Sequence, residues 1–386
     1  MKICIAVSEF NPFHFGHAEF LRQCRALTGA DAVVCAMGGN FTQRGEIAVM
    51  EKRARARVAL TQGADAVIEL PTPVAVGNAE RFATGAIALF RGVKAELVLC
   101  CGSEIADGEL LLRAARFFSR EPKAYQAEIQ ALLKQGEGLP KAREKALFAV
   151  NKGEFAPLIS NPNATLAVEY AKACLKAKIP FVTYQRKGSY HAETLPENGV
   201  EISGSAIRKA VMDGKAQELT PYLPSESLAL LPQSVPSVDQ GLYCALLTKS
   251  KRELRSLPDC TEGLENRIFS ALRESKNYAE FLEKAKTKRY VLSRLKRISA
   301  CALLGVETHV GKACQKRAPY LRVLGVKKGK EGVLSALATA NAPLLTKRKD
   351  AEKLKGYAKK SFMADERAEA IFRQFDGENY PFFVKI

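Results

Sequence analysis

Two histidines three residues apart, His14 and His17, are the residues of this sequence whose type and spacing most directly indicate chemistry. The chain has four histidines in 386 residues, and these two fall where a short apolar run, residues 2–7, gives way to a segment of helical composition. The first turn of a helix offers unpaired backbone N–H groups and a partial positive charge to an anion. Side chains at i and i+3 face the same way, and Gly16 lets a ligand approach the backbone closely. The pattern predicts a clamp on the phosphates of a nucleotide; the alternative is two polar residues that only cap a helix.

Apolar runs alternate with segments of helical composition through the first half of the chain. The expected strands are residues 2–7, 31–37, 65–70, 96–101 and 179–185, and the expected helices are 18–27, 50–62, 79–90 and 163–177. Such runs are typical of strands buried on both faces of a parallel sheet, so the pattern predicts an α/β fold with a doubly wound parallel sheet. Residues 121–151 are expected to be helices inserted on this scaffold. Ligands of such sheets bind beyond the carboxyl ends of the strands, where the histidine motif falls.

A second candidate phosphate site follows a predicted loop that holds His191. The segment 202–208 places Ser203 and Ser205 at the start of a predicted helix, with Arg208 one turn later. A serine at this position is most often an N-cap. Two hydroxyls and a fixed cation also suit a polyphosphate. Together with the histidine motif upstream, the segment favours phosphate binding.

The two motifs together resemble the nucleotidylyltransferase superfamily, and longer strings resemble the bacterial tRNA(Met) cytidine acetate ligase family. The strings are SEFNPFHFGH (8–17), GNFTQRGE (39–46), CGSE (101–104), PNATL (162–166), TKRY (287–290) and YLRVLG (320–325), which span nearly the whole chain. The sequence departs from the family at Ala164, where a second asparagine is usual, and at Cys101, where an aromatic residue is usual. These departures affect the expected adenosine contacts more than the phosphate clamp.

The resemblance implies a nucleotidylyltransferase-like Rossmann domain and a reaction in two steps. Acetate attacks the α-phosphate of ATP to give acetyl-adenylate, and the acetyl group then passes to the wobble cytidine of elongator tRNA(Met), forming N(4)-acetylcytidine. The implied ATP-binding residues are Val7, Ser8, Glu9, Phe10, Asn11, Pro12, Phe13, His14, Phe15, Gly16, His17, Gly102, Asn163 and Arg186. We expect His14 and His17 to stabilise the transition state, and Arg208, with Ser203 and Ser205, to hold the β- and γ-phosphates. Mg²⁺ is expected with ATP, although no acidic cluster indicates a protein ligand for a metal.

The charge of the chain indicates an RNA partner. The net charge is +18, but residues 1–215 carry 28 Lys and Arg against 22 Asp and Glu, whereas residues 216–386 carry 31 against 19. A concentrated positive excess is the electrostatic footprint of a polyanion partner. The residues predicted to bind RNA are Lys288, Arg289, Arg294 and Arg322. The alternative, which holds for most single charge runs, is a solvated helix face.

Four prolines between residues 220 and 238 mark a connector between two parts. The predicted domains are residues 1–219, which bind ATP and catalyse, and residues 220–386, a basic and mostly α-helical domain that binds tRNA. At this length each part is expected to bury its own core. A chain ending near Val238 is therefore expected to keep the acetate-dependent half-reaction.

The remaining features narrow the class of protein. The ten cysteines include no C-x-x-C pair, so no zinc site is expected. Free thiols, with no signal peptide and no long apolar span, indicate the cytoplasm and no membrane. His191 and His309 stand alone and are expected to be surface or core residues rather than ligands. Two alternatives stay open: a coenzyme-type adenylyltransferase, which would not need a basic helical half, and a non-catalytic RNA-binding protein.

Overall fold

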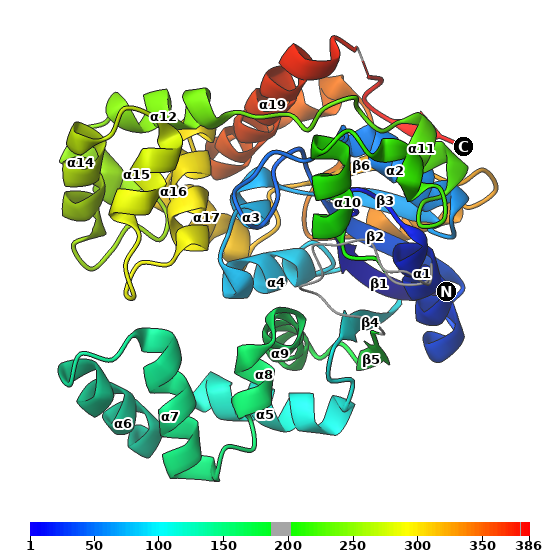
Figure 1. Cartoon of the computed structure of the whole chain (residues 1–386). Coiled ribbons are helices and arrows are strands. Elements are labelled where there is room, and N and C mark those ends of the chain that lie inside the picture. The colour runs from blue at the N-terminus through cyan, green and yellow to red at the C-terminus, as the bar shows by residue number, and fades with distance from the viewer. Residues whose placement is uncertain (187–201, 379) are drawn as a thin grey trace.

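The computed structural model describes residues 1–186, 202–378 and 380–386. Within them one sheet has the strand order β5-β4-β1-β2-β3-β6-β7, with β8 paired to β6 (Figure 1). The strands are β1 (Lys2–Ser8), β2 (Ala32–Gly38), β3 (Ala66–Leu70), β4 (Glu96–Ser103), β5 (Phe181–Gln185), β6 (Leu321–Val326), β7 (Leu344–Leu345) and β8 (Val384–Lys385). Neighbouring strands from β5 to β3 are parallel. The predicted doubly wound parallel sheet is confirmed.

Helices precede, follow and connect these strands. Those before the connector are α1 (Phe15–Thr28), α2 (Lys52–Thr61), α3 (Thr72–Ala75), α4 (Ala79–Ala88), α5 (Gly108–Arg120), α6 (Lys123–Lys134), α7 (Leu139–Asn151), α8 (Ala156–Ser160), α9 (Pro162–Ala177), α10 (Gly204–Met212) and the 3-10 helix η1 (Ala216–Leu219). Those after it are α11 (Ser225–Ala229), α12 (Asp239–Leu247), α13 (Lys251–Ser256), α14 (Leu264–Glu274), α15 (Tyr278–Ala285), α16 (Leu292–Leu304), α17 (Thr308–Lys316), α18 (Gly332–Leu337), η2 (Arg348–Lys353) and α19 (Gly356–Asp376). The inserted helices predicted for residues 121–151 are α6 and α7.

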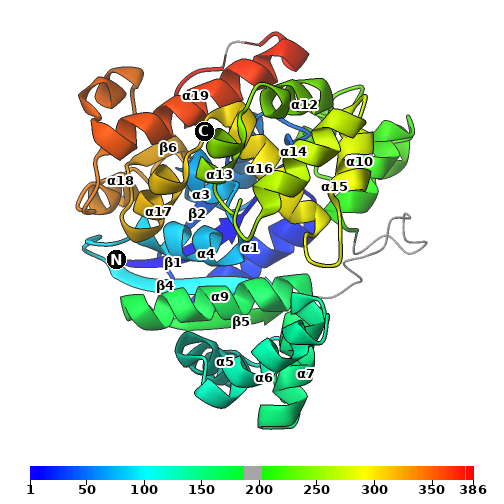
Figure 2. The same cartoon turned by 90° about the vertical axis from the view of Figure 1, so that its left-hand side faces the viewer.

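The central strands β1, β2 and β3 are buried on both faces, which explains why they are mostly apolar. Along β1, Ile3 and Ile5 point to one face, whereas Cys4 and Ala6 point to the other. The first face packs against α3, α4, α5, α9, α17 and α18, and the second against α1 and α2. Figure 2 shows α9 beside β4 and β5, with α5, α6 and α7 beyond it. The site is therefore built at an edge of this sheet and not on a face.

The strand order has a switch point between β1 and β4. The chain passes from β1 to β2 on one side and later returns to β4 on the other side. The carboxyl ends of β1 and β4 lie next to each other, since Ala6 pairs with Cys100. Open α/β sheets bind ligands at such a point. The histidine motif after β1 and Gly102 near the end of β4 thus fall at one place.

The second part of the chain is mostly helical, as predicted, but it is not a separate body. Helices α12 to α16 gather around a second core, to which Phe41, Ile47 and Val76 of the first part also contribute (Figure 1). Residues 310–337, however, share the main core of the sheet, and β6 pairs antiparallel with β3. The expectation that each part buries its own core is therefore wrong. The boundary at residue 220 stays a prediction about sequence organisation.

Candidate functional site

The two histidines lie at the junction between the turn that follows β1 and the start of α1. His14 occupies the N-cap position of the helix, with extended backbone (φ −137°, ψ 169°), and His17 lies in the first turn. The ring centroids are 3.7 Å apart, and the backbone N–H of His14 donates to Nδ1 of His17 over 3.3 Å. Because Nδ1 of His17 accepts a hydrogen bond, the ring proton belongs on Nε2. His17 is therefore arranged as an Nε2–H donor.

Burial keeps both imidazoles neutral. Only 4% of His14 is exposed, and burial, with the charge of Arg186 as a second cause, lowers the pKa of His14 to about 3. The pKa of His17 is well below its ordinary value because of burial, then His14, then Arg186. Gly16 makes room for this arrangement, since a Cβ there would stand 3.0 Å from the His14 ring. Both rings can donate to an anion without carrying a charge of their own.

Two buried polar atoms at this edge lack partners in the described part of the chain. They are Nδ1 of His14 and the hydroxyl of Ser8, the last residue of β1. Buried polar atoms without a hydrogen bond are rare in folded proteins and call for an explanation. A polar ligand at the end of β1 would supply one.

The turn between β1 and α1 is anchored from distant segments. The carbonyl of Asn11 accepts from Nη1 of Arg208 over 2.9 Å, and the carbonyl of Phe13 accepts from the hydroxyl of Ser227 over 2.9 Å. The side-chain oxygen of Asn11 accepts from the N–H of Val49 over 2.7 Å. Phe10 has a φ of 48°, a region that a bulky residue rarely adopts. Anchors from three segments hold this turn in an uncommon shape.

The second predicted motif reaches the same place. Ser203 is the N-cap of α10, and its hydroxyl accepts from the N–H of Ala206 over 3.0 Å, so the capping interpretation is correct for this serine. The hydroxyl of Ser205 accepts from Nη2 of Arg208 over 3.1 Å. A Cβ on Gly204 would lie 3.3 Å from the carbonyl of Asn11. The structure therefore brings the start of α10 against the histidine turn; its phosphate contacts stay a prediction.

The end of β4 supplies the other side of the site. The N–H of Arg186 donates to the carbonyl of Ser103 over 3.0 Å, and its side chain lies over Gly102, where a Cβ would stand 3.0 Å from Cγ of Arg186. Asn163 donates to Oε1 of Glu104 over 2.6 Å, and the other carboxylate oxygen accepts from the N–H of Ala164 over 2.9 Å. Arg186 is therefore held near the imidazoles, and Glu104 fixes Asn163 at the start of α9.

Glu9 lies among cations at this edge. Its carboxylate accepts from the N–H of Gln43 over 2.6 Å. Burial raises the pKa of Glu9, while the Gln43 hydrogen bond and the charges of Arg55, Arg208 and Arg44 oppose that rise. Three guanidinium groups close enough to act on one carboxylate make the edge electropositive. Such a potential favours an anionic ligand.

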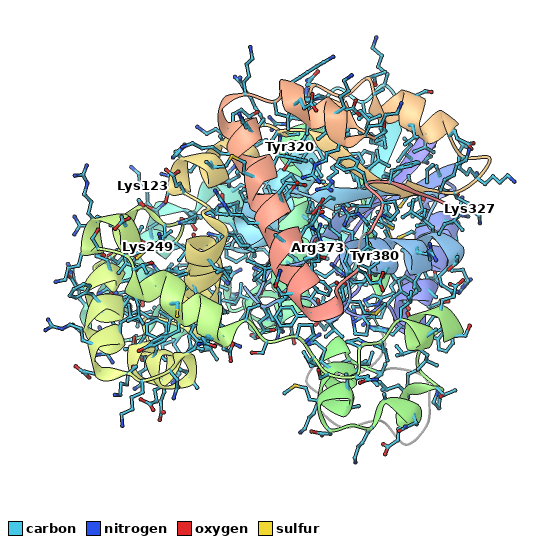
Figure 3. All side chains as sticks on the ribbon, turned by 90° about the horizontal axis from the view of Figure 1, so that it is seen from above. Lys123, Lys249, Tyr320, Lys327, Arg373 and Tyr380 are labelled. Atoms are coloured by element: carbon cyan, nitrogen blue, oxygen red, sulfur yellow. The ribbon has the colours of Figure 1, made fainter. Side chains whose placement is uncertain are left out.

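The residues predicted to bind RNA divide into different classes. Lys288 and Arg289 are exposed on the loop between α15 and α16. The side chain of Arg294 is 18% exposed. Its Nε donates to the carbonyl of Asp259 over 2.9 Å, and its Nη2 donates to the hydroxyl of Thr261 over 2.9 Å. In Figure 3, Lys249 and Lys327 lie on opposite sides of the molecule. Basic side chains of this part therefore lie on more than one side of the molecule.

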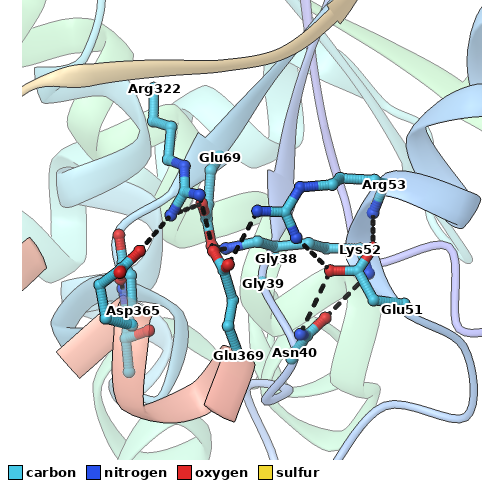
Figure 4. A network of polar contacts seen from close by, with 12 residues as sticks. Gly38, Gly39, Asn40, Glu51, Lys52, Arg53, Glu69, Arg322, Asp365 and Glu369 are labelled. Atoms are coloured by element: carbon cyan, nitrogen blue, oxygen red, sulfur yellow. Dashed lines mark hydrogen bonds and ion pairs between the residues drawn. The ribbon is translucent and has the colours of Figure 1, made fainter. Parts of the chain in front are cut away.

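The prediction that Arg322 binds RNA is wrong. This residue lies on β6 and has no exposed surface, and its Nη2 pairs with Oε1 of Glu369 at 2.7 Å (Figure 4). The same carboxylate oxygen pairs with Nζ of Lys52 at 2.7 Å, and Nζ also pairs with Oε1 of Glu69 at 2.5 Å. This buried network joins α2, β3, β6 and α19. Arg322 therefore binds carboxylates of this chain instead of RNA.

The same network also reaches the turn after β2, which the sequence did not indicate. A Cβ on Gly39 would stand 2.7 Å from Oε1 of Glu69, so a larger residue there would displace the carboxylate that Lys52 binds. Asn40 accepts from the N–H of Lys52 over 2.8 Å. Burial, followed by the charge of Glu69, raises the pKa of Asp365 to about 7. The only sequence signal was the basic composition of α2, which predicted no burial.

Other predictions concern isolated residues and absences. The side chain of His309 is 58% exposed and pairs with Glu307, as expected for a surface histidine, whereas His191 lies outside the described residues. Among the described residues, no group of three or more His, Cys, Asp or Glu is placed to hold a metal ion. No described helix is both long and apolar enough to cross a membrane.

Comparisons with known proteins agree over the whole chain. A model of the HIGH Nucleotidyl Transferase family matches residues 1–381. A tRNA(Met) cytidine acetate ligase of Clostridium perfringens (strain ATCC 13124) is 33% identical over an alignment of 346 positions that covers 86% of each chain. The one of Thermosipho melanesiensis is 34% identical over 355 residues, 88% of this chain and 83% of the relative. Crystal structures of Thermotoga maritima TmcAL cover 100% of both chains: the form bound with alpha-thio ATP has a TM-score of 0.87 at 29% identity, and the apo form 0.89 at 30%.

Proposed function

The chain belongs to the HIGH nucleotidyl transferase family and, within it, to the tRNA(Met) cytidine acetate ligases, and we propose that it uses ATP and acetate to acetylate the wobble cytidine of elongator tRNA(Met). One observation carries the assignment of the site. Two motifs about 190 residues apart, the histidine turn and the start of α10, meet at the switch point of the sheet through Arg208 and Asn11. Buried, unpartnered polar atoms of Ser8 and His14 lie at the same edge.

In the first step a carboxylate oxygen of acetate attacks the α-phosphorus of ATP. A new P–O bond forms, the bond from the α-phosphorus to the bridging oxygen breaks, and pyrophosphate leaves with the electron pair. Charge spreads over the phosphate oxygens during this exchange, and fixed N–H donors and guanidinium groups stabilise it without solvent reorganisation. Nε2–H of His17, the His14 imidazole, Arg208 and Arg186 would have this role. Neither histidine acts as a nucleophile.

In the second step the N4 amine of cytidine attacks the acetyl carbon of acetyl-adenylate. The amide bond forms, the bond from that carbon to the AMP oxygen breaks, and AMP leaves while N4 loses a proton. Adenylation is needed because the carboxylate of acetate repels nucleophiles and oxide is a very poor leaving group. The enzyme therefore separates activation of acetate, which needs no RNA, from acetyl transfer, which does.

Mg²⁺ and tRNA would be held in different ways. The described residues contain no cluster of acidic or histidine ligands, and Mg²⁺ in such sites is commonly carried by the phosphates of the nucleotide. The RNA would contact exposed basic side chains of the second part, of which Lys288 and Arg289 are the best placed of those predicted. Because the proposed substrate is tRNA, we infer that the protein acts in the cytoplasm.

The test combines two assays on the full-length protein. The first measures exchange of labelled pyrophosphate into ATP with and without acetate and without RNA. The second measures N(4)-acetylcytidine by mass spectrometry of nucleosides after reaction with methionine tRNA, ATP and labelled acetate. We expect acetate-dependent exchange and label at the wobble position, and no label in a matched tRNA with uridine there. Pyrophosphate exchange that is equally fast with and without acetate would indicate a coenzyme-type adenylyltransferase. No exchange, even with tRNA present, would refute the ligase assignment.

A further inference from the structure

Arg55, on α2, makes an unusual set of contacts beneath the site. It is fully buried. Its Nε donates to the carbonyl of Met50 over 2.9 Å, and its Nη1 donates to the carbonyls of Glu9 and of Gly38, the latter over 3.1 Å. Its Nη2 donates to the carbonyl of Gly39 over 2.5 Å. One guanidinium group thus binds four backbone carbonyls from three separate segments.

These contacts are not those of a stabilising ion pair. Among the described residues, the ion pairs of α2 include Lys52 and Arg53 but not Arg55. Burial lowers the pKa of Arg55 to about 10, against the charges of Glu51, Glu9 and Glu69, which act on it from farther away. Burying a cation without a directly paired carboxylate is costly. Its direct partners are instead backbone carbonyls, whose positions it can fix.

The segments that Arg55 joins are those that face the predicted ligand. Glu9 follows β1 in the histidine turn, Gly38 and Gly39 end β2, and Met50 precedes α2. Arg208 likewise donates a hydrogen bond to the carbonyl of Asn11, two residues after Glu9. Carbonyl oxygens repel phosphates, and a guanidinium group that binds these oxygens offsets that repulsion. The two arginines together orient the turn for an anion.

We propose that Arg55 is a positioning residue for ATP: it holds the turns after β1 and β2 in the arrangement that receives the triphosphate, and its buried charge attracts that anion. The inference rests on the proposed function, because it assumes that the triphosphate binds at the ends of β1 and β2. It differs from the roles of His14, His17 and Arg208, since Arg55 itself touches no substrate. A rigid support of this kind matters because displacements of about 1 Å can lower the rate of an enzyme roughly 10²-fold.

The test replaces Arg55 with lysine, which keeps the charge and loses the planar fork that reaches several carbonyls. Arg53→Lys is the matched control: Arg53 lies on the same helix, is 5% exposed, and pairs with Glu51 and Glu369 at 2.8 Å. The readouts are the KM for ATP, the KM for acetate and kcat in acetate-dependent pyrophosphate exchange, with the thermal midpoint of each variant. Methionine tRNA binding is measured by filter retention.

We expect Arg55→Lys to raise the KM for ATP roughly tenfold and to lower kcat, while the KM for acetate and tRNA affinity stay unchanged. Arg53→Lys should lose thermal stability to a similar degree and keep the wild-type KM for ATP. Equal effects of the two substitutions on that KM would show that Arg55 is only structural. An unchanged KM in folded Arg55→Lys would also overturn the inference. If wild-type protein lacks acetate-dependent exchange, it is the proposed function that fails.

Two further measurements keep the inference testable if Arg55→Lys does not fold. Arg55→Gln removes the charge and keeps an amide donor, and it should raise the KM for ATP more than lysine does. Hydrogen exchange of the unchanged protein needs no variant: ATP should protect the amides of residues 38–40 and 50–55 as well as the histidine turn. Protection of the histidine turn alone would contradict the inference.

Discussion

The neutral, buried state of His14 has a consequence for acid stability that His14→Gln can test. Burial holds the pKa of His14 at about 3 in the folded protein, against an ordinary value of 6.5. Between these two pH values the unfolded chain binds a proton that the folded chain does not bind. The free energy of unfolding therefore falls as the pH falls through this window. Above pH 6.5 neither state binds the proton, and the protein has lost no stability through His14. Glutamine does not titrate and lacks this dependence.

The magnitude follows from the width of the window. Each pH unit within it changes the free energy of unfolding by about 1.4 kcal/mol for one such group. Lowering the pH from 6.5 to about 4.5 should therefore remove about 2–3 kcal/mol through His14 alone. That loss is a large part of the roughly 5–15 kcal/mol by which proteins of this kind are stable. The stability difference between wild type and His14→Gln should shift by this amount toward the variant.

Urea unfolding, followed by circular dichroism from about pH 7.5 to about pH 4.5, measures this difference. Other groups that titrate in the window, Glu9 among them, are common to both proteins and largely cancel in the comparison. His309→Gln is the control, because it makes the same substitution at an exposed position on α17. Parallel pH dependences for His14→Gln and wild type would refute the argument that His14 is held neutral by burial.

Three further predictions concern the chemistry, the RNA and the architecture. His14→Ala or His17→Ala should lower acetate-dependent pyrophosphate release roughly 10²–10³-fold and leave filter-bound tRNA unchanged; wild-type rates would remove both from the catalytic set. Replacing Lys288 and Arg289 together with alanine should reduce the slope of log affinity for tRNA against log salt by up to about two without altering pyrophosphate exchange. An unchanged slope would show that neither side chain contacts a phosphate of the tRNA. A chain ending at Val238 should be insoluble, as sedimentation would show, because it lacks β6; a soluble, active truncation would contradict this expectation.

The parallel part of the sheet was predictable because its signals are local. Each strand from β1 to β5 is a short apolar run, and each is bounded by turn residues or by a helix with a polar face. The histidine turn could be placed for the same reason, since the end of β1 and the start of α1 are adjacent in the sequence. Its electrostatics could not be predicted, because the turn is enclosed by segments far away in the sequence, such as those of Arg208 and Ser227, which bind the carbonyls of Asn11 and Phe13.

The antiparallel strand β6 was missed for the opposite reason. Its six residues include Arg322 and Gly325 and follow a basic segment, so the run resembles part of an RNA-binding surface. Its place is determined by pairing with β3 over about 250 residues of intervening chain. A sequence pattern carries no information on such pairing. The error matters for function, because removal of the second part would expose β3 and leave Lys52 and Glu69 without Arg322.

Basic residues illustrate how far composition can be interpreted. Helix α2 has four lysines and arginines in ten residues, yet Lys52, Arg53 and Arg55 are buried. Lys52 and Arg53 pair with carboxylates, whereas Arg55 binds only carbonyls in its direct contacts. Net charge treats all of them alike. Their partners distinguish them: a cation paired with carboxylates is neutralised within the fold, whereas a buried cation whose direct partners are carbonyls fixes the position of the backbone. By this criterion Arg322, within the network, belongs to the architecture, and Arg55, beneath the histidine turn, belongs to the site.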